Sequence, residues 1–204
     1  MKTLLMQNNT ETFCRFLITA LVLFSLILLS RPVSAENIQV NGIDFPVRYA
    51  ASETTLELRG AAMLRWAMMV DLYAGALYLP KDVPARKWPE DVPKLLELSY
   101  FREIPAKGFV ESSQEHLQST LTPEKLDQIQ SRLRQLYGLF QDIGPGDRYT
   151  LSYQPQVGTS LSLNGKVLGT IPGVDFAAAY FGIWLGEQPL NKKFRDQVLG
   201  FSAS

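Results

Sequence analysis

Apolar residues in this chain gather in short runs separated by polar turn residues, and one run is much longer than the rest. Residues 58–80 (LRGAAMLRWAMMVDLYAGALYLP) have an apolar interior in which only Arg65 and Asp71 carry charge. The run is long enough to cross a membrane, but charges at mid-bilayer cost several kcal/mol. Its second half is rich in Val, Leu and Tyr, which favour strands. The pattern therefore predicts a long strand, or a pair of strands, through the middle of a sheet.

Turn chemistry indicates further strands on both sides of that run. Two Asn-Gly pairs, which suit a type I′ turn, stand between apolar segments and predict hairpins over 38–45 and 159–168. Single strands are predicted over 94–101 and 148–153, where apolar and aromatic residues predominate. A proline-broken loop with a short helix near 85–88 is expected to precede the strand at 94–101.

Helices are predicted from capping residues and from apolar residues spaced three and four apart. Thr122-Pro123 is a helix start in which Thr caps and Pro takes the first turn, and an amphipathic face follows as far as Phe140. Other helices are expected over 105–119, 172–185 and 189–199, and the middle one of these is apolar almost all round, as a buried helix is. Strands, helices, strands and helices in this order predict an α+β fold with a mostly antiparallel sheet and helices on one face.

The first 35 residues have the plan of a secretory signal peptide. A polar leader is followed by an uncharged apolar run over 16–29, and Val33-Ser34-Ala35 places small residues at the cleavage positions. We expect cleavage after Ala35 and a periplasmic or secreted product, and an uncleaved N-terminal anchor is the alternative. Cys14 would leave with the leader, so the mature domain, residues 36–204, would have no disulfide and no thiol chemistry.

Charge and composition argue against several classes of function. Without Lys2, Arg15, Arg31 and Glu11 of the leader, a chain with 20 basic and 20 acidic residues keeps a net charge of about −2 and has no basic run. Nucleic-acid binding needs a phosphate-neutralising surface and is therefore not expected. A metal site needs more ligands than the single histidine, His116, can provide. The sequence contains no nucleophile motif, phosphate loop or cofactor signature, so no cofactor is predicted.

Several segments resemble one protein family. The run GAAMLRWAMMVDLYAGALYLP resembles the G-A-G-x-x-R … V-Y-x-A-x-L-Y-L core of the chalcone isomerase-like superfamily. The later segments LELSYFREIPAKGFVES, GDRYTLSY, NGKVLGTIPGVDFAAAYFGIWLGEQP and FRDQVLG resemble, in the same order, its exported bacterial branch. The resemblance covers residues 56–200 and implies an open-faced β-sandwich, in which a helical layer covers one face of a large antiparallel sheet with a ligand cleft between them.

The superfamily contains true isomerases, fatty-acid-binding relatives and non-catalytic helpers, so the site must decide the function. By resemblance, Arg65 matches the arginine that holds the substrate oxyanion in the enzymes, and Tyr73 matches a tyrosine of the fatty-acid binders where the enzymes have threonine. Phe109 stands where the enzymes have a tyrosine, His116 falls near an asparagine, and Ile183 falls near a threonine. Two hydroxyl donors are thus absent, and one such donor is typically worth ~10²–10³ in rate.

The resemblance therefore implies a non-catalytic protein that binds a fatty acid or a similar small apolar molecule with an acidic head group. Arg65 would pair with the carboxylate, Tyr73 would donate a second hydrogen bond, and the late apolar helix would supply part of the apolar wall. In the alternative structural interpretation, Arg65 pairs with Asp71 or Asp175, Tyr73 belongs to the core and His116 lies at the surface. Two other functions stay open: an isomerase or lyase of the chalcone isomerase type on another substrate, and a structural or partner-binding protein with a filled cleft.

Overall fold

The computed structural model describes residues 36–51, 54–66 and 70–201, so the predicted signal peptide lies outside the described residues. A seven-stranded antiparallel sheet forms its centre, and neighbouring strands follow one another in the chain. These strands are β3 (Arg48–Ala51), β4 (Thr54–Trp66), β5 (Val70–Pro80), β6 (Lys94–Tyr100), β7 (Arg148–Gln154), β8 (Gly158–Leu163) and β9 (Lys166–Ile171). The long apolar run is thus a pair of strands, β4 and β5, in the interior of the sheet.

Both predicted Asn-Gly hairpins are present. Asn41 and Gly42 have φ values of 50° and 82° between β1 (Asn37–Val40) and β2 (Ile43–Pro46). Asn164 and Gly165 repeat this geometry, with φ values of 50° and 80°, between β8 and β9. Positive φ at both central positions is what a type I′ turn requires, and Asn and Gly adopt it most easily. The β1–β2 hairpin forms a separate two-stranded sheet.

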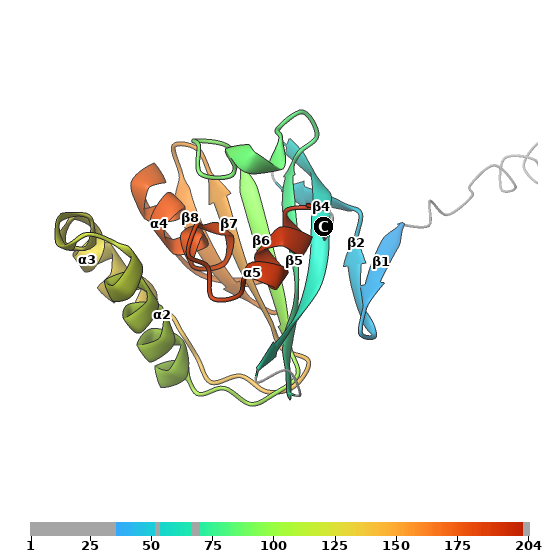
Figure 1. The fold of residues 1–204 in the computed structure, drawn as a ribbon, viewed down its shortest axis with the longest axis horizontal. Coiled ribbons are helices and arrows are strands. Elements are labelled where there is room, and N and C mark those ends of the chain that lie inside the picture. The colour runs from blue at the N-terminus through green and yellow to red at the C-terminus, as the bar shows by residue number, and fades with distance from the viewer. Residues whose placement is uncertain (1–35, 52–53, 67–69, 202–204) are drawn as a thin grey trace, which may run out of the picture. The chain divides into compact units, whose positions relative to one another are not determined.

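Helices cover one face of the seven-stranded sheet (Figure 1), where α3, α4 and α5 contact β9, β8 and β4, respectively. The described helices are the 3₁₀ helix η1 (Ala85–Lys87) and the α-helices α2 (Ala106–Thr120), α3 (Pro123–Tyr137), α4 (Val174–Leu185) and α5 (Lys192–Val198). This arrangement confirms the predicted α+β fold, with a mostly antiparallel sheet under a helical layer.

Three helices are shorter than predicted, for local reasons. Helix α3 ends at Tyr137, before Gly138, so Phe140 lies beyond the helix. Helix α4 begins only at Val174, because its N-cap residue Gly173 has a φ of 107°, outside the helical region. Helix α5 begins at Lys192, because the side-chain oxygen of Asn191 accepts a hydrogen bond of 2.8 Å from the Phe194 amide and caps the helix there.

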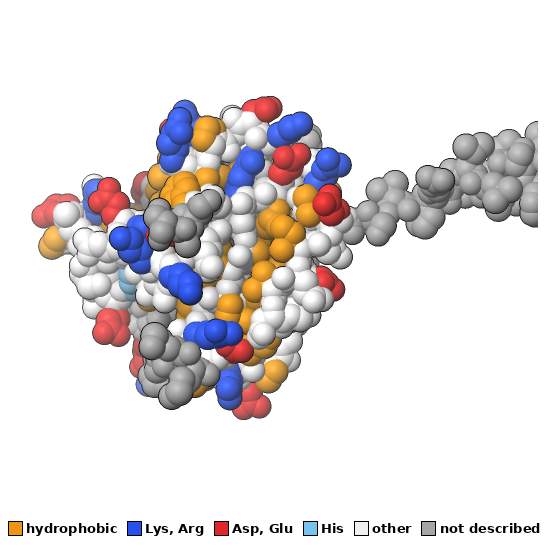
Figure 2. Space-filling model, turned by 45° about the vertical axis from the view of Figure 1, so that its right-hand side comes forward, with side chains coloured by type: hydrophobic (Ala, Val, Ile, Leu, Met, Phe, Trp, Pro, Cys, Tyr) orange, Lys and Arg blue, Asp and Glu red, His pale blue; other side chains and the backbone are white. Residues whose placement is uncertain are grey.

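The two faces of the sheet bury different cores. The larger core lies between the sheet and the helices. The smaller core lies on the other face, where Phe45 of the β1–β2 hairpin packs with Leu56, Tyr78 and Leu95. On the molecular face shown in Figure 2, basic and acidic side chains are interspersed. Among the described residues, no helix has the length and hydropathy needed to cross a membrane.

Two irregularities in the β4–β5 pairing decide which side chains face the helices. The register skips Arg59 on β4 and Leu72 on β5, so each is the extra residue of a β-bulge. Before the first bulge the even-numbered Leu58 packs in the smaller core, whereas after it the even-numbered Leu64 packs in the larger one. The second bulge lets two consecutive residues, Leu72 and Tyr73, face the larger core.

Candidate functional site

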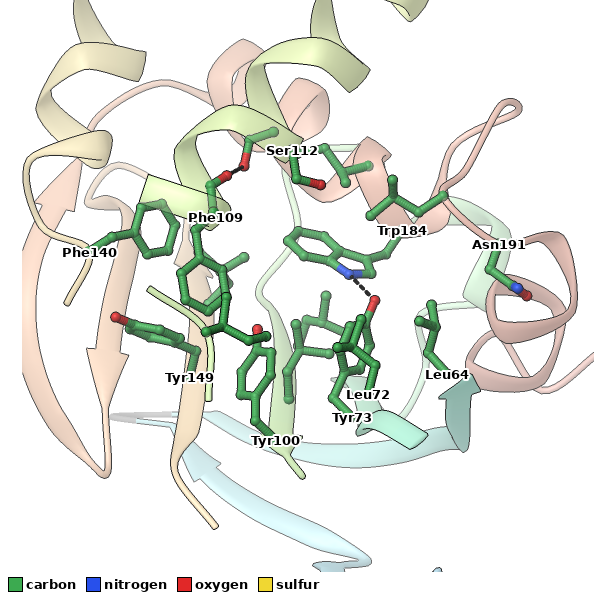
Figure 3. A pocket seen from close by; sticks show the side chains of 18 of the residues that line it. Leu64, Leu72, Tyr73, Tyr100, Phe109, Ser112, Phe140, Tyr149, Trp184 and Asn191 are labelled. Atoms are coloured by element: carbon green, nitrogen blue, oxygen red, sulfur yellow. Dashed lines mark hydrogen bonds between the residues drawn. The ribbon is translucent and has the colours of Figure 1, made fainter. Parts of the chain in front are cut away.

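A cavity of about 550 Å³ lies between the inner face of the sheet and helices α2 and α4. Its floor comes from β4 to β8, and its walls come from α2, α4 and residues that follow α3 and α4. Figure 3 shows side chains converging on it from the sheet and from the helices. Small-molecule sites typically measure about 300–1,000 Å³. At about 30 Å³ for each water-sized group, the cavity holds roughly 18 of them.

Most of the cavity surface is apolar. Leucine side chains from β5 to β8 form much of the floor, and aromatic rings form the walls. The rings of Phe109 and Phe140 stack with their centroids 5.1 Å apart, and Phe109 meets the rings of Tyr100 and Tyr149 edge to face at 5.5 and 5.2 Å. Aromatic pairs of this kind hold one another in place. The walls therefore offer a fixed, hydrocarbon-like surface to a ligand.

Four tyrosines of the described chain line the cavity, and the hydroxyl groups of two of them donate hydrogen bonds to other groups of the protein. The Tyr149 hydroxyl donates to the backbone oxygen of Gln141 at 3.0 Å. The Ser113 hydroxyl donates to the Phe109 carbonyl at 2.5 Å, so the 3.1 Å contact between Ser113 and Tyr180 must use the proton of Tyr180. These two hydroxyl protons are thus committed within the fold.

The other two tyrosines, Tyr73 and Tyr100, keep their protons available. The indole nitrogen of Trp184 can only donate, so the Tyr73 oxygen is the acceptor in their 2.9 Å hydrogen bond (Figure 3). Among the described residues, no group accepts the Tyr73 proton and none bonds to the Tyr100 hydroxyl. Desolvation by burial raises the pKa of both tyrosines above the usual value of 10.0, so both stay protonated donors near neutral pH.

Arg65 borders the cavity, and the Nε atom of its guanidinium group is paired with Asp71, which does not line the cavity. Its Nε atom lies 2.6 Å from Oδ1 of Asp71, and 56% of its side chain is exposed. The other Asp71 oxygen accepts a 3.1 Å hydrogen bond from the side chain of Asn41, in the turn of the β1–β2 hairpin. Asp175 pairs instead with Arg132, at 2.5 Å. The ion pair of Arg65 is therefore the one with Asp71.

The remaining predicted site residues divide between the cavity and the surrounding structure. Tyr73, Phe109 and Ile183 line the cavity. Phe109 and Ile183 have no hydroxyl group to offer to a ligand. His116 is half-buried on α2 and does not line the cavity, and burial lowers its pKa from the usual value of 6.5. On the late helix, Trp184 contributes to the lining, whereas Phe181 is core.

Tyr100 and Ser113 were not predicted from the sequence. Tyr100 ends the strand KLLELSY, all of which is buried, so no alternation reveals which residues face the cavity. A signal exists in the pairing of strands, because Tyr73 lies opposite Tyr100 in the β5–β6 register. Ser113 lies one helical turn after Phe109, a spacing that places both on one face of α2.

No metal centre is present in the described part of the chain, where no three His, Cys, Asp or Glu side chains converge. The polar groups of the lining are tyrosine and serine hydroxyls, one indole N–H, the Asn191 side chain and, at the border, Arg65. This arrangement can bind and orient an apolar molecule that carries a hydrogen-bond acceptor.

Comparisons with known proteins agree with this architecture. Residues 37–200 match the model of the chalcone isomerase-like family. No curated protein matches the sequence. Among solved structures, the chain is similar to the crystal structure of an Arabidopsis thaliana fatty-acid binding protein, with a TM-score of 0.63 and 17% identity over 81% of this chain and 96% of that chain. At this identity the likeness is one of fold. Because the family model spans nearly all of the described residues, this chain belongs to the chalcone isomerase-like family.

Proposed function

We propose that this protein is an exported, non-catalytic binder of a fatty acid or a similar apolar molecule with an acidic head group. The observation that carries the proposal is the cavity of about 550 Å³ between the sheet and the helices, which combines apolar walls with a few hydroxyl donors. Binding sites for apolar small molecules have this composition. The Arabidopsis protein of the same fold, a fatty-acid binding protein, supports the same class of ligand.

The composition of the cavity favours a binder over an isomerase. Phe109 and Ile183 stand at positions where, by resemblance, the enzymes carry hydroxyl donors, and both line the cavity without one. Each donor that an enzyme loses from such a site typically lowers the rate by ~10²–10³. A structural protein with a filled cleft fits less well, because its cleft would leave no cavity of this volume.

Export rests on the pattern of the first 35 residues. We propose that they are removed after Ala35 and that the protein works in the periplasm or outside the cell. The intact mass of the protein isolated from a fractionated culture tests this proposal. A product that begins at Glu36 in the periplasmic or secreted fraction is expected, and the full-length chain in the membrane fraction would instead indicate an uncleaved anchor.

Native mass spectrometry of the protein purified without added ligand tests the binding function. We expect a bound lipid of one main mass. This lipid should be lost in the variant Ser112→Trp, because Ser112 is an exposed lining residue of α2 and an indole at this position would occupy part of the cavity. Glu115→Trp is the matched control, since Glu115 is exposed on the same helix but does not line the cavity. A protein that carries no lipid and takes up no added fatty acid would contradict the proposal.

A further inference from the structure

Among the described residues, two buried tyrosines of the cavity are neutral donors whose protons no protein group accepts. Tyr73 and Tyr100 are only 5% and 4% exposed, and they stand opposite each other on β5 and β6. Their ring centroids are 5.4 Å apart, and both rings line the cavity from neighbouring strands (Figure 3). Both tyrosines line the cavity, and each hydroxyl keeps a proton that it can donate to a ligand there. A ligand oxygen in this region would satisfy both donors.

The one charged side chain that the described residues contribute to the lining, Arg65, shares its charge with a partner outside the lining. Arg65 is half-exposed and is held at 2.6 Å by Asp71, which is itself bound by Asn41. A carboxylate bound at the terminal nitrogens of Arg65 would share the positive charge with Asp71, which already holds the Nε atom. A buried anion without a close cation is strongly disfavoured.

We propose that Tyr73 and Tyr100 form a head-group subsite that takes an uncharged carbonyl oxygen, in a ketone, an ester or an un-ionised carboxylic acid, in preference to a carboxylate. This inference rests on the proposed binding function and names the state in which the head group is bound. The Tyr73 hydroxyl, oriented by the Trp184 N–H, and the Tyr100 hydroxyl each donate one hydrogen bond to that oxygen. The apolar remainder of the ligand lies among the leucine and phenylalanine side chains of the cavity.

Equilibrium dialysis with two matched ligands, dodecanoic acid and 2-tridecanone, tests the subsite at pH 5.5 and pH 8.0. We expect the ketone to bind equally at both values. The affinity for the acid should fall by at least about tenfold at the higher pH, since the un-ionised fraction of a carboxyl with a pKa near 4 falls steeply over this range. Tyr73→Phe and Tyr100→Phe should each weaken ketone binding by about 2- to 12-fold, the value of one neutral hydrogen bond.

Two control variants separate this subsite from the alternatives. Tyr78→Phe makes the same chemical change on β5, but Tyr78 packs in the smaller core on the other face of the sheet, so ketone binding should not change. Arg65→Gln should leave both affinities unchanged. Acid binding that is as tight at pH 8.0 as at pH 5.5 and that is lost in Arg65→Gln would overturn the neutral subsite while leaving the binding function intact. Failure of the unmodified protein to bind either ligand would overturn the binding function itself.

Discussion

Lys94 is the first residue of β6, and its burial makes a specific prediction about stability and pH. The side chain is 0% exposed, its ammonium group donates a 2.9 Å hydrogen bond to the Glu90 carbonyl, and the nitrogen lies 4.4 Å from the centre of the Tyr153 ring. These contacts compensate only partly for lost hydration. Desolvation lowers the pKa of Lys94 from 10.5 to about 8, and the nearby carboxylate of Asp91 opposes this change.

The sign of the effect follows from proton linkage. The pKa of Lys94 is lower in the folded protein than in the unfolded chain. Between about pH 8 and pH 10.5 the unfolded chain therefore binds more protons than the folded protein. Folding becomes more favourable as the pH rises through this window. With these two pKa values, the free energy of unfolding should increase by about 1 kcal/mol between pH 7.5 and pH 9.0. Above pH 9 we expect the free energy of unfolding to fall again. Tyrosines ionise near pH 10 in the unfolded chain, whereas burial raises the pKa of Tyr137 and Tyr153 to about 12 in the folded protein. The unfolded chain therefore gives up these protons first, which favours unfolding.

Urea denaturation at pH 7.5, 8.0, 8.5 and 9.0 measures this gain directly. The matched variant is Lys94→Met, which keeps a long apolar side chain in the same space and removes the titrating amine. We expect the unmodified protein to gain stability with pH relative to this variant. Parallel pH profiles for the two proteins, or a stability that falls from pH 7.5 onward, would show that the Lys94 amine is hydrated in the folded protein and would refute the reasoning.

Three further changes test contacts that stabilise the fold, each by urea denaturation. Gly60→Ala should destabilise the fold by about 3 kcal/mol, because a Cβ atom at Gly60 would lie 2.1 Å from a backbone oxygen of α5; an unchanged midpoint would mean that α5 docks differently. Arg148→Met should cost about 3–5 kcal/mol by leaving the 6%-exposed Glu97 without its cation, and a loss below 1 kcal/mol would contradict this. Asp175→Asn should cost no more than about 1 kcal/mol and should reduce the loss of stability below pH 4, because Arg132 lowers the pKa of Asp175.

Much of the fold could be predicted from the sequence because its signals are local. The Asn-Gly turns, the Thr122-Pro123 cap and the apolar run of α4 each depend on a few neighbouring residues, and each is present in the structure. The placement of the β1–β2 hairpin could not be predicted in this way. Its position depends on Phe45 entering a second core on the outer face of the sheet, and nothing in the hairpin's own residues specifies that contact.

The candidate site was harder to predict because it depends on the face to which each strand residue turns. Tyr73 and Tyr100 belong to strand segments that are buried without interruption, so their sequences show no alternation of apolar and polar residues. The bulge at Leu72 further breaks the two-residue period just before Tyr73. His116 follows Phe109 by seven residues and so shares its face of α2, yet it lies outside the cavity lining, and spacing alone does not show where along the helix the cavity ends.

The same geometry accounts for the different environments of Arg65 and Tyr100. Arg65 follows Leu64 at the border of the cavity, and its Nε atom is held by Asp71, which lies opposite it in the register and does not line the cavity. Tyr100 lies opposite Tyr73 across β5 and β6, and cross-strand partners share a face, so both rings meet in the cavity. An arginine in a family motif therefore does not by itself place a cation inside the site. Here the pairing of strands leaves the interior with neutral donors, and this is why we expect the bound head group to be uncharged.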